Sequence, residues 1–158
     1  VYSDLGLAYQ SSGDVDHAIA MFGKALTLKP KDANTAFNLG TLLAAQGKFQ
    51  EAQDAFQKAV ENNPRMAQAH DRLGTILSLN GNYKEAAQEF RQALMIGPET
   101  AAAHYGLGVA LYRLKNYPAC IPELKRALAL NPSLIDAHNK IDHAFRKAGL
   151  AQGPAALN

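Results

Sequence analysis

The sequence predicts an all-α fold, a solenoid of antiparallel helix pairs that ends in a C-terminal capping helix. The first observation behind this prediction is a period, because prolines recur every 34 residues, at Pro30, Pro64, Pro98 and Pro132. The second is that glycine, alanine and phenylalanine columns keep the same interval. The third is that apolar residues within each period follow the three-and-four spacing of an amphipathic helix. A period of this length that holds two helices is typical of stacked helical repeats.

Each period is expected to hold one helix pair. In the second period, Ala36 and Leu43 mark a first helix, Phe56 and Ala59 mark a second, and Gly47 lies between them as a left-handed stop. Each closing proline lacks the N–H group that would continue the second helix. The predicted organisation is a single array over residues 1–150, with units at about 1–32, 33–66, 67–100 and 101–134, a capping helix at 134–148, and a flexible tail at 151–158.

Polar residues are expected to cap the second helices. Asn82 has Glu85 three residues later, which is the spacing of a capping box, and Asp14 and Asn116 occupy the same column. A side-chain oxygen at this position accepts a hydrogen bond from a backbone N–H group of the first turn. We therefore expect caps at all three positions.

One glycine per unit lies inside the first helix, where glycine costs about 1 kcal/mol relative to alanine. These glycines are Gly6, Gly40, Gly74 and Gly108. Because the cost is repeated in every complete unit, we expect the backbone of the second helix to pass too close for a methyl group. Small residues of the second helices, at Ala52, Ala86 and Cys120, are expected to face the glycines.

The fourth unit departs from the pattern. Lys115 replaces the glycine between the helices, so either Lys115 or Asn116 must take the left-handed turn, at a cost of about 1–2 kcal/mol. Pro122 falls inside the second helix, where proline removes a hydrogen bond. We expect a local distortion there, and a hinge used in binding is the alternative.

The last predicted helix, at 134–148, is interpreted as a cap. Asp142 stands in the glycine column of this helix. One face of the helix is apolar and the other is charged, which is what the end of a solenoid needs in order to stay in water.

The composition indicates a soluble, folded chain. Hydrophobic residues make up 47% of the 158 residues. No apolar run approaches the roughly 20 residues that cross a bilayer, and no secretory signal is visible. Because the chain begins at Val1 within a helical pattern, we expect a fragment or a processed product. Solubility fits the cytoplasm, but the sequence does not name the compartment.

The repeated residues resemble the tetratricopeptide repeat (TPR) family. Its signature is W-x2-L-G-x2-Y, then A-x3-F, then P, over a period of 34 residues. The chain repeats this order as YSDLGLAY with AIAMF, AFNLGTLL with AQDAF, HDRLGTIL with AAQEF, and HYGLGVAL with CIPEL. The resemblance covers almost the whole chain. It implies a right-handed superhelical solenoid whose first helices line a concave groove for an extended peptide or a helix of another protein.

The family's groove positions, carried over to this sequence, give the expected peptide-binding residues. They are Asn34, Phe37, Asn38, Thr41, Gln68, Asp71, Arg72, Thr75, Ser78, Tyr105, Val109, Tyr112, Arg113, Asn139, Lys140, His143, Arg146 and Lys147. The aromatics Phe37, Tyr105 and Tyr112 are expected on faces that packing within a repeat does not require, as in binding surfaces. The alternative is that they pack on neighbouring units.

Charge is unevenly distributed along the chain, with a net −2 over residues 1–100 and a net +4 over residues 101–158. A basic cluster at Arg113, Lys140, Arg146 and Lys147 would favour an acidic segment or a free carboxylate of the partner. A solvated cap explains the same charges.

The family's clamp for chaperone C-termini is not expected, although Asn38 and Arg72 match it. Ser3, Leu7 and Gln68 stand where the clamp's lysines and asparagine belong.

Catalytic, cofactor and metal sites are not expected. His70, His104 and His138 recur every 34 residues, so they lie in one column of successive units, whose neighbouring elements are about 8–10 Å apart, too far to share one zinc ion. These rings are interpreted as half-buried packing residues. Cys120 is expected to be buried and inert. No nucleotide-binding or hydrolase motif is present.

Three functions remain open after this reading. The leading one is a non-enzymatic module that binds a peptide or helix of a partner protein. The second is self-association, in which the tail could enter the groove of a neighbouring copy. The third is a specificity domain of a larger enzyme such as a glycosyltransferase. Nucleic-acid binding is not expected, since acidic residues are frequent in the second and third units, and neither is membrane insertion.

Overall fold

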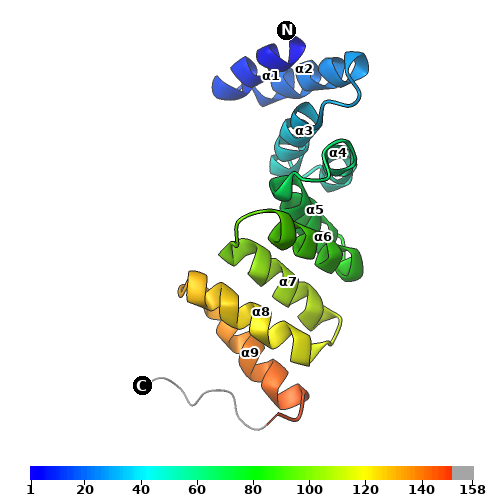
Figure 1. The fold of residues 1–158 in the computed structure, drawn as a ribbon. Helices are drawn as coiled ribbons and strands as arrows, with labels where there is room; N and C mark the ends of the chain where they lie inside the picture. Colours follow the sequence, from blue (N-terminus) through cyan, green and yellow to red (C-terminus); the bar gives the residue numbers. More distant parts are fainter. Residues whose placement is uncertain (151–158) are drawn as a thin grey trace.

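The computed structural model describes residues 1–150, which form nine α-helices and no strand. The helices are α1 (Tyr2–Ser11), α2 (Val15–Leu28), α3 (Ala33–Ala45), α4 (Phe49–Asn62), α5 (Ala67–Leu79), α6 (Tyr83–Ile96), α7 (Ala101–Arg113), α8 (Tyr117–Leu130) and α9 (Ile135–Lys147). Figure 1 shows them as an elongated stack with α1 and α2 at one end and α9 at the other. The all-α solenoid prediction is confirmed. The predicted flexible tail, 151–158, lies outside the described residues.

Helices pack chiefly on their neighbours in the chain. The first helix of each unit contacts its second helix most extensively, as α3 contacts α4 and α7 contacts α8. Each second helix then contacts the first helix of the next unit. Buried side chains from α3 to α9 form one continuous core, and a smaller cluster lies around Ala18 and Phe22 of α2. Such a fold is quasi-one-dimensional, because each unit depends on its neighbours.

Left-handed residues make the turns between paired helices. Gly47 has a φ of 74° and Gly81 a φ of 84°, in the region where glycine has no steric penalty. In the fourth unit, Lys115 occupies this position with a φ of 61°. The choice that the sequence left open between Lys115 and Asn116 is therefore settled for Lys115.

Replacing Lys115 with glycine is expected to raise the free energy of unfolding by about 1 kcal/mol, because glycine relieves the left-handed strain. The side chain is exposed, so little packing is lost. Urea denaturation followed by circular dichroism measures the change. The control is Lys58→Gly, in the exposed middle of α4, which should lower stability by about 1 kcal/mol. Equal losses in both variants would contradict the strained turn.

Side-chain caps start several of the helices. Asp14 accepts a hydrogen bond from the backbone N–H group of His17, and Asn116 accepts one from Ala119. The predicted cap at Asn82 is wrong, because its side chain makes no such bond. The backbone angles of Asn82 (φ −84°, ψ 62°) nearly match those of Asn116 (φ −84°, ψ 69°), so the side-chain orientation accounts for the difference.

The helix-interior glycines face aromatic rings, so the expectation of a backbone contact is wrong in the first three units. A Cβ atom added to Gly40 would lie 2.9 Å from the ring of Phe56, and one added to Gly74 would lie 3.1 Å from the ring of Phe90. At Gly108 the neighbour is the Leu124 side chain, at 2.7 Å. The backbone nitrogen of that leucine lies at 3.3 Å, so a backbone atom is among the three nearest neighbours in the fourth unit.

The two irregular elements at the C-terminal end are both helical. Helix α8 continues through Pro122, and whether this proline acts as a hinge stays a prediction. Helix α9 buries Ala137, Ile141 and Ala144 against the preceding unit. Its bounds agree with the predicted capping helix to within a residue, and Arg146 and Lys147 stand exposed in its last turn.

Candidate functional site

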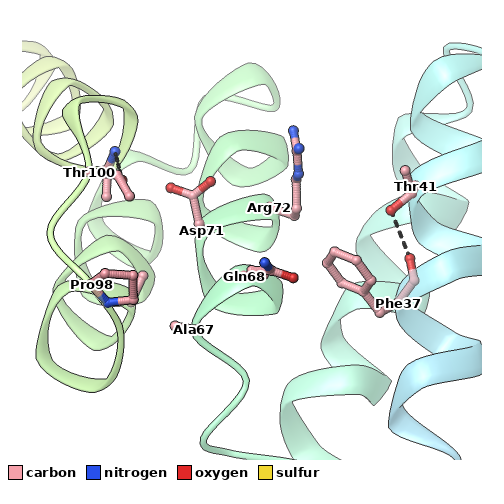
Figure 2. A pocket seen from close by; sticks show the side chains of 10 residues that line it. Phe37, Thr41, Ala67, Gln68, Asp71, Arg72, Pro98 and Thr100 are labelled. Carbon is pink, nitrogen blue, oxygen red and sulfur yellow. Dashed lines mark hydrogen bonds between the residues drawn. The ribbon is translucent and has the colours of Figure 1, made fainter. Parts of the chain in front are cut away.

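The first helices α3, α5 and α7 border a pocket that we call the central pocket, with a volume of about 400 Å³. Its lining residues are Phe37, Thr41, Ala67, Gln68, Asp71, Arg72, Ala93, Pro98, Thr100 and Ala103. Figure 2 shows α5 in the middle of this pocket, with Phe37 and Thr41 on one side and Pro98 and Thr100 on the other. Five predicted groove residues, from Phe37 to Arg72, meet here.

A second pocket of about 390 Å³, which we call the α5–α7 pocket, lies farther along α5 and α7. Its lining residues are Thr75, Ser78, Leu79, Tyr83, Phe90, Ala102, Tyr105, Gly106, Val109 and Arg113. Five more predicted residues meet here: Thr75, Ser78, Tyr105, Val109 and Arg113. Together the two pockets form the groove face of α3, α5 and α7.

The other predicted residues do not line either pocket. They are Asn34, Asn38, Tyr112, Asn139, Lys140, His143, Arg146 and Lys147. The sequence prediction did not include Pro98 and Thr100, because it was limited to positions on the first helix of each unit. These two residues lie in the connection between α6 and α7. The prediction also missed Gly106, which has no glycine counterpart in the other units.

Asp71 is the distinctive polar group of the central pocket. Its Oδ1 atom is buried and has no hydrogen-bond partner among the described residues. Burial raises the pKa of the carboxyl above its usual value, and the nearby charge of Arg72 opposes this only in part. In Figure 2 the carboxylate of Asp71 extends toward Thr100, whereas Arg72 extends along the side of α5 that faces α3.

The predicted aromatic residues are partly committed to packing. Phe37 packs on Phe56 of its own unit, with ring centroids 5.7 Å apart, and Tyr112 packs on Tyr117 of its own unit at 5.7 Å. The prediction that packing within a repeat does not use them is wrong for these two. The hydroxyl of Tyr105 reaches the next unit and donates to Asp136 at 2.5 Å. Burial, with the Asp136 charge, raises the pKa of Tyr105 to about 12.

The predicted basic cluster is only partly open. Lys140 forms an ion pair with Asp136, and this contact is the main reason that the pKa of Asp136 is lowered. His143 shares a hydrogen bond with the hydroxyl of Tyr112 at 2.9 Å. The first contact lies within α9, and the second joins α7 to α9. Arg113 stays on the groove face, with its guanidinium 5.6 Å from the ring centroid of Tyr83.

Two of the repeated histidines join the first helix of a unit to the second. His70 Nδ1 lies 2.6 Å from the Glu89 carboxylate, and its Nε2 lies 3.0 Å from the Pro64 carbonyl. His104 lies in the same way between Glu123, at 2.6 Å, and Glu99, at 2.7 Å. The interpretation as packing residues is therefore confirmed for these two rings.

The third member of the column, His138, is exposed, so the same interpretation is wrong there. Within residues 1–150, no second helix follows α9 to cover it.

In the fourth unit, Arg126 and secondarily His104 lower the pKa of Glu99 to about 2.

Metal binding and thiol reactivity each require particular side-chain surroundings. Among residues 1–150, no group of three histidine, cysteine or acidic side chains is placed to hold a metal ion. Cys120 is 0% exposed, so the prediction that this cysteine is buried is confirmed. Burial raises the pKa of its thiol to about 11, and its lack of reactivity stays a prediction.

Comparison with protein-family models identifies the repeats. Models described as tetratricopeptide repeat match residues 1–62, 37–99 and 80–135. The chain belongs to the tetratricopeptide repeat family. TPR proteins are protein-interaction scaffolds. The sequence has no match among the curated proteins.

Solved structures similar to this TPR chain share its fold. The crystal structure of MamA is 25% identical, with a TM-score of 0.85 over 94% of this chain and 81% of that one. YrrB, described as a TPR protein with an unusual peptide-binding site, is 29% identical, with a TM-score of 0.72 over 81% of this chain and 66% of that one. PilF of Pseudomonas aeruginosa is 23% identical, with a TM-score of 0.73 over 94% and 68%, and shows the fold alone.

None of the helices within residues 1–150 of this TPR chain is both long enough and apolar enough to cross a membrane.

Proposed function

We propose that this chain is a non-catalytic protein-interaction module that binds a peptide segment of a partner protein along the groove face of α3, α5 and α7. The observation that carries the proposal is the convergence of ten predicted groove residues on two pockets of that face. Each pocket has the volume of a few side chains and mixes apolar walls with a few polar groups, as binding sites do. The likeness to YrrB, described as having a peptide-binding site, supports this reading.

The groove face should bind a partner segment that carries an acidic residue or a free carboxylate near Arg113. This arginine lines the α5–α7 pocket, and its planar guanidinium suits two-point hydrogen bonding to a carboxylate. Lys140 contributes less than the sequence indicated, because Asp136 already neutralises it. Arg146 and Lys147 are exposed on α9 and extend the positive field beyond the groove face.

A selection of random twelve-residue peptides on the immobilised chain tests the proposal. Peptides recovered on the wild type should bind about tenfold more weakly to Val109→Arg, which fills the α5–α7 pocket, and should bind normally to Met95→Arg on the exposed side of α6. Recovery of no peptide, or an equal effect of both variants, would reject the groove face as the binding surface.

Charge reversal tests the acidic preference separately. Arg113→Glu should weaken an acidic peptide by about tenfold and flatten its salt dependence, because the attraction between exposed charges is screened by salt. The matched control is Arg91→Glu, on the exposed side of α6, which should leave both quantities unchanged. If Arg113→Glu and Arg146→Glu both bind like the wild type, the acidic preference is wrong.

Self-association is a second candidate, favoured by an apolar surface at the α1 end. Leu5 is exposed, whereas its equivalents one, two and three periods later are half-buried at Leu39 and buried at Leu73 and Leu107. Leu28 of α2 is exposed beside it. Light scattering over a range of concentrations should then give a mass above the 17.0 kDa of one chain. A constant monomer mass would remove this candidate.

No described residue favours an enzyme specificity domain, and we do not propose one.

A further inference from the structure

The central pocket contains an acidic group that the fold itself leaves uncompensated. Among the described residues, Asp71 Oδ1 is buried without a donor, and Arg72 forms no ion pair with it. Asp71 as a residue is half-buried, but its Oδ1 atom has lost its hydration without gaining a hydrogen bond, which is unfavourable. Such a group on the wall of a pocket is unlike the paired carboxylates of Glu89 and Glu123, which hold the helices together.

The other hydroxyls of this pocket already have partners. The Thr41 hydroxyl donates to the carbonyl of Phe37, and the Thr100 hydroxyl accepts from the backbone N–H group of Ala103. Gln68 and Arg72 also line the pocket, and in Figure 2 the Arg72 guanidinium extends along the side of α5 that faces α3, whereas the Asp71 carboxylate extends toward Thr100. Asp71 is therefore the acceptor-only group on the Thr100 side of the pocket. Because an ionised carboxylate only accepts hydrogen bonds, its complement is a group that donates them.

Five of the ten residues that line the central pocket are apolar. Phe37 stands on the α3 side and Pro98 on the opposite side. Ala67, Ala93 and Ala103 are the other apolar residues of the wall. A volume of about 400 Å³ accepts a long side chain together with part of its backbone. Lysine and arginine combine an aliphatic stem with a cationic head, so they match both the apolar walls and the carboxylate.

We propose that the central pocket binds a lysine or arginine side chain of the partner peptide, with the stem between Phe37 and Pro98 and the cationic head donating to Asp71. This inference rests on the proposed function, and it deepens that function by naming the residue class that is recognised. A metal ion does not fit the site, since no described group of three ligands surrounds it. An acidic side chain would be repelled by Asp71 and is expected at Arg113 instead.

The groove face then has two poles of opposite charge. Asp71 lies on the first half of α5, in the central pocket, and Arg113 lies at the end of α7, in the α5–α7 pocket. A partner segment with a basic residue and an acidic residue would satisfy both poles in one orientation only. Opposite charges at separate points of a groove fix direction and register more than they add affinity.

The test is a peptide selection on matched variants, with random twelve-residue peptides as the probe. On the wild type, recovered peptides should be enriched in lysine or arginine at one position, and Asp71→Asn should remove that enrichment. Asp54→Asn, an exposed aspartate of α4, is the control and should keep it. Asp71→Lys should instead recover peptides with aspartate or glutamate at that position. Melting curves show which variants are folded, and either Asp71 variant alone suffices for the comparison.

A double-mutant cycle on one recovered peptide gives the second readout. Changing its basic residue to methionine keeps an unbranched stem and should weaken binding to the wild type by about tenfold, but change binding to Asp71→Asn by less than about twofold. Equal losses on both proteins, or recovered peptides without a conserved cation, would overturn this inference while leaving peptide binding intact. If no peptide is recovered at all, both proposals fail. A smaller mass of Asp71→Asn in light scattering would assign the pocket to a second copy of the chain and also overturn the inference.

Discussion

Replacing Phe90 with alanine is expected to lower the free energy of unfolding by about 3–5 kcal/mol. The ring is 2% exposed and belongs to the continuous core. It lies where the third and fourth units meet, because Cβ atoms added to Gly74 and to Gly106 would both fall on it, at 3.1 Å and 2.4 Å. Its removal leaves a cavity that α5 and α7 cannot close without moving their backbones.

Urea denaturation of Phe90→Ala followed by circular dichroism measures this loss. The control is Phe49→Ala in α4, a phenylalanine that is 40% exposed and should cost less than about 1.5 kcal/mol. The site also predicts how the variant unfolds. Each unit of a solenoid is stabilised by its neighbours, so weakening one joint can separate unfolding into two steps. A loss no larger than that of the control would show that the ring does not join the units.

The period alone determines most of this fold, because every helix pair obeys the same local rules. Turn glycines, closing prolines and apolar spacing are each visible in a single unit, and repetition confirms them. What the sequence could not show is which columns meet in space. Gly40 and Gly74 meet the rings of Phe56 and Phe90, each 16 residues later, rather than the facing alanines. A glycine can pack against a large ring as well as against a small residue such as alanine. The residue types in each column therefore do not show which of these two contacts forms.

Half of the residues that line the two pockets could be predicted from the sequence, again because the repeats share one pattern. Column positions select the inner face of each first helix, and five residues fell in each pocket. Column positions do not show when two such residues form a hydrogen bond with each other. Tyr105 with Asp136 and Tyr112 with His143 are each 31 residues apart, and both pairs serve the α7–α9 contact instead of a ligand.

A repeated spacing between histidine and glutamate in the sequence reflects contacts between paired helices. His70 with Glu89 and His104 with Glu123 are both 19 residues apart, so the pairing recurs in two units. A histidine column followed at constant spacing by a glutamate column predicts a hydrogen bond between the two helices of a unit. By contrast, the unpartnered oxygen of Asp71 has no sequence signature, because burial and the absence of a donor depend on how three helices pack.

Replacing Gly106 with alanine is expected to lower the free energy of unfolding by about 1–3 kcal/mol, although glycine-to-alanine changes in helices are normally stabilising. Two effects oppose each other. Alanine gains about 1 kcal/mol of helix propensity. Against this, the new methyl group would lie 2.4 Å from Cζ of Phe90, so the buried ring has to move away from its contacts with α7 and with Gly74. Overpacking should therefore exceed the gain in propensity.

Gly23→Ala is the matched control, since this glycine lies inside α2 and an added Cβ atom meets nothing within 4 Å. That variant should become more stable by about 1 kcal/mol, with the opposite sign to Gly106→Ala. Combining Gly106→Ala with Phe90→Leu should cost at least about 1 kcal/mol less than the sum of the single changes, because the smaller side chain makes room for the methyl group. The variant also bears on function, because Gly106 and Phe90 both line the α5–α7 pocket, and a displaced ring would enter it. If Gly106→Ala stabilises the chain as much as Gly23→Ala does, the ring does not fill the joint, and the shape proposed for the groove face fails with it.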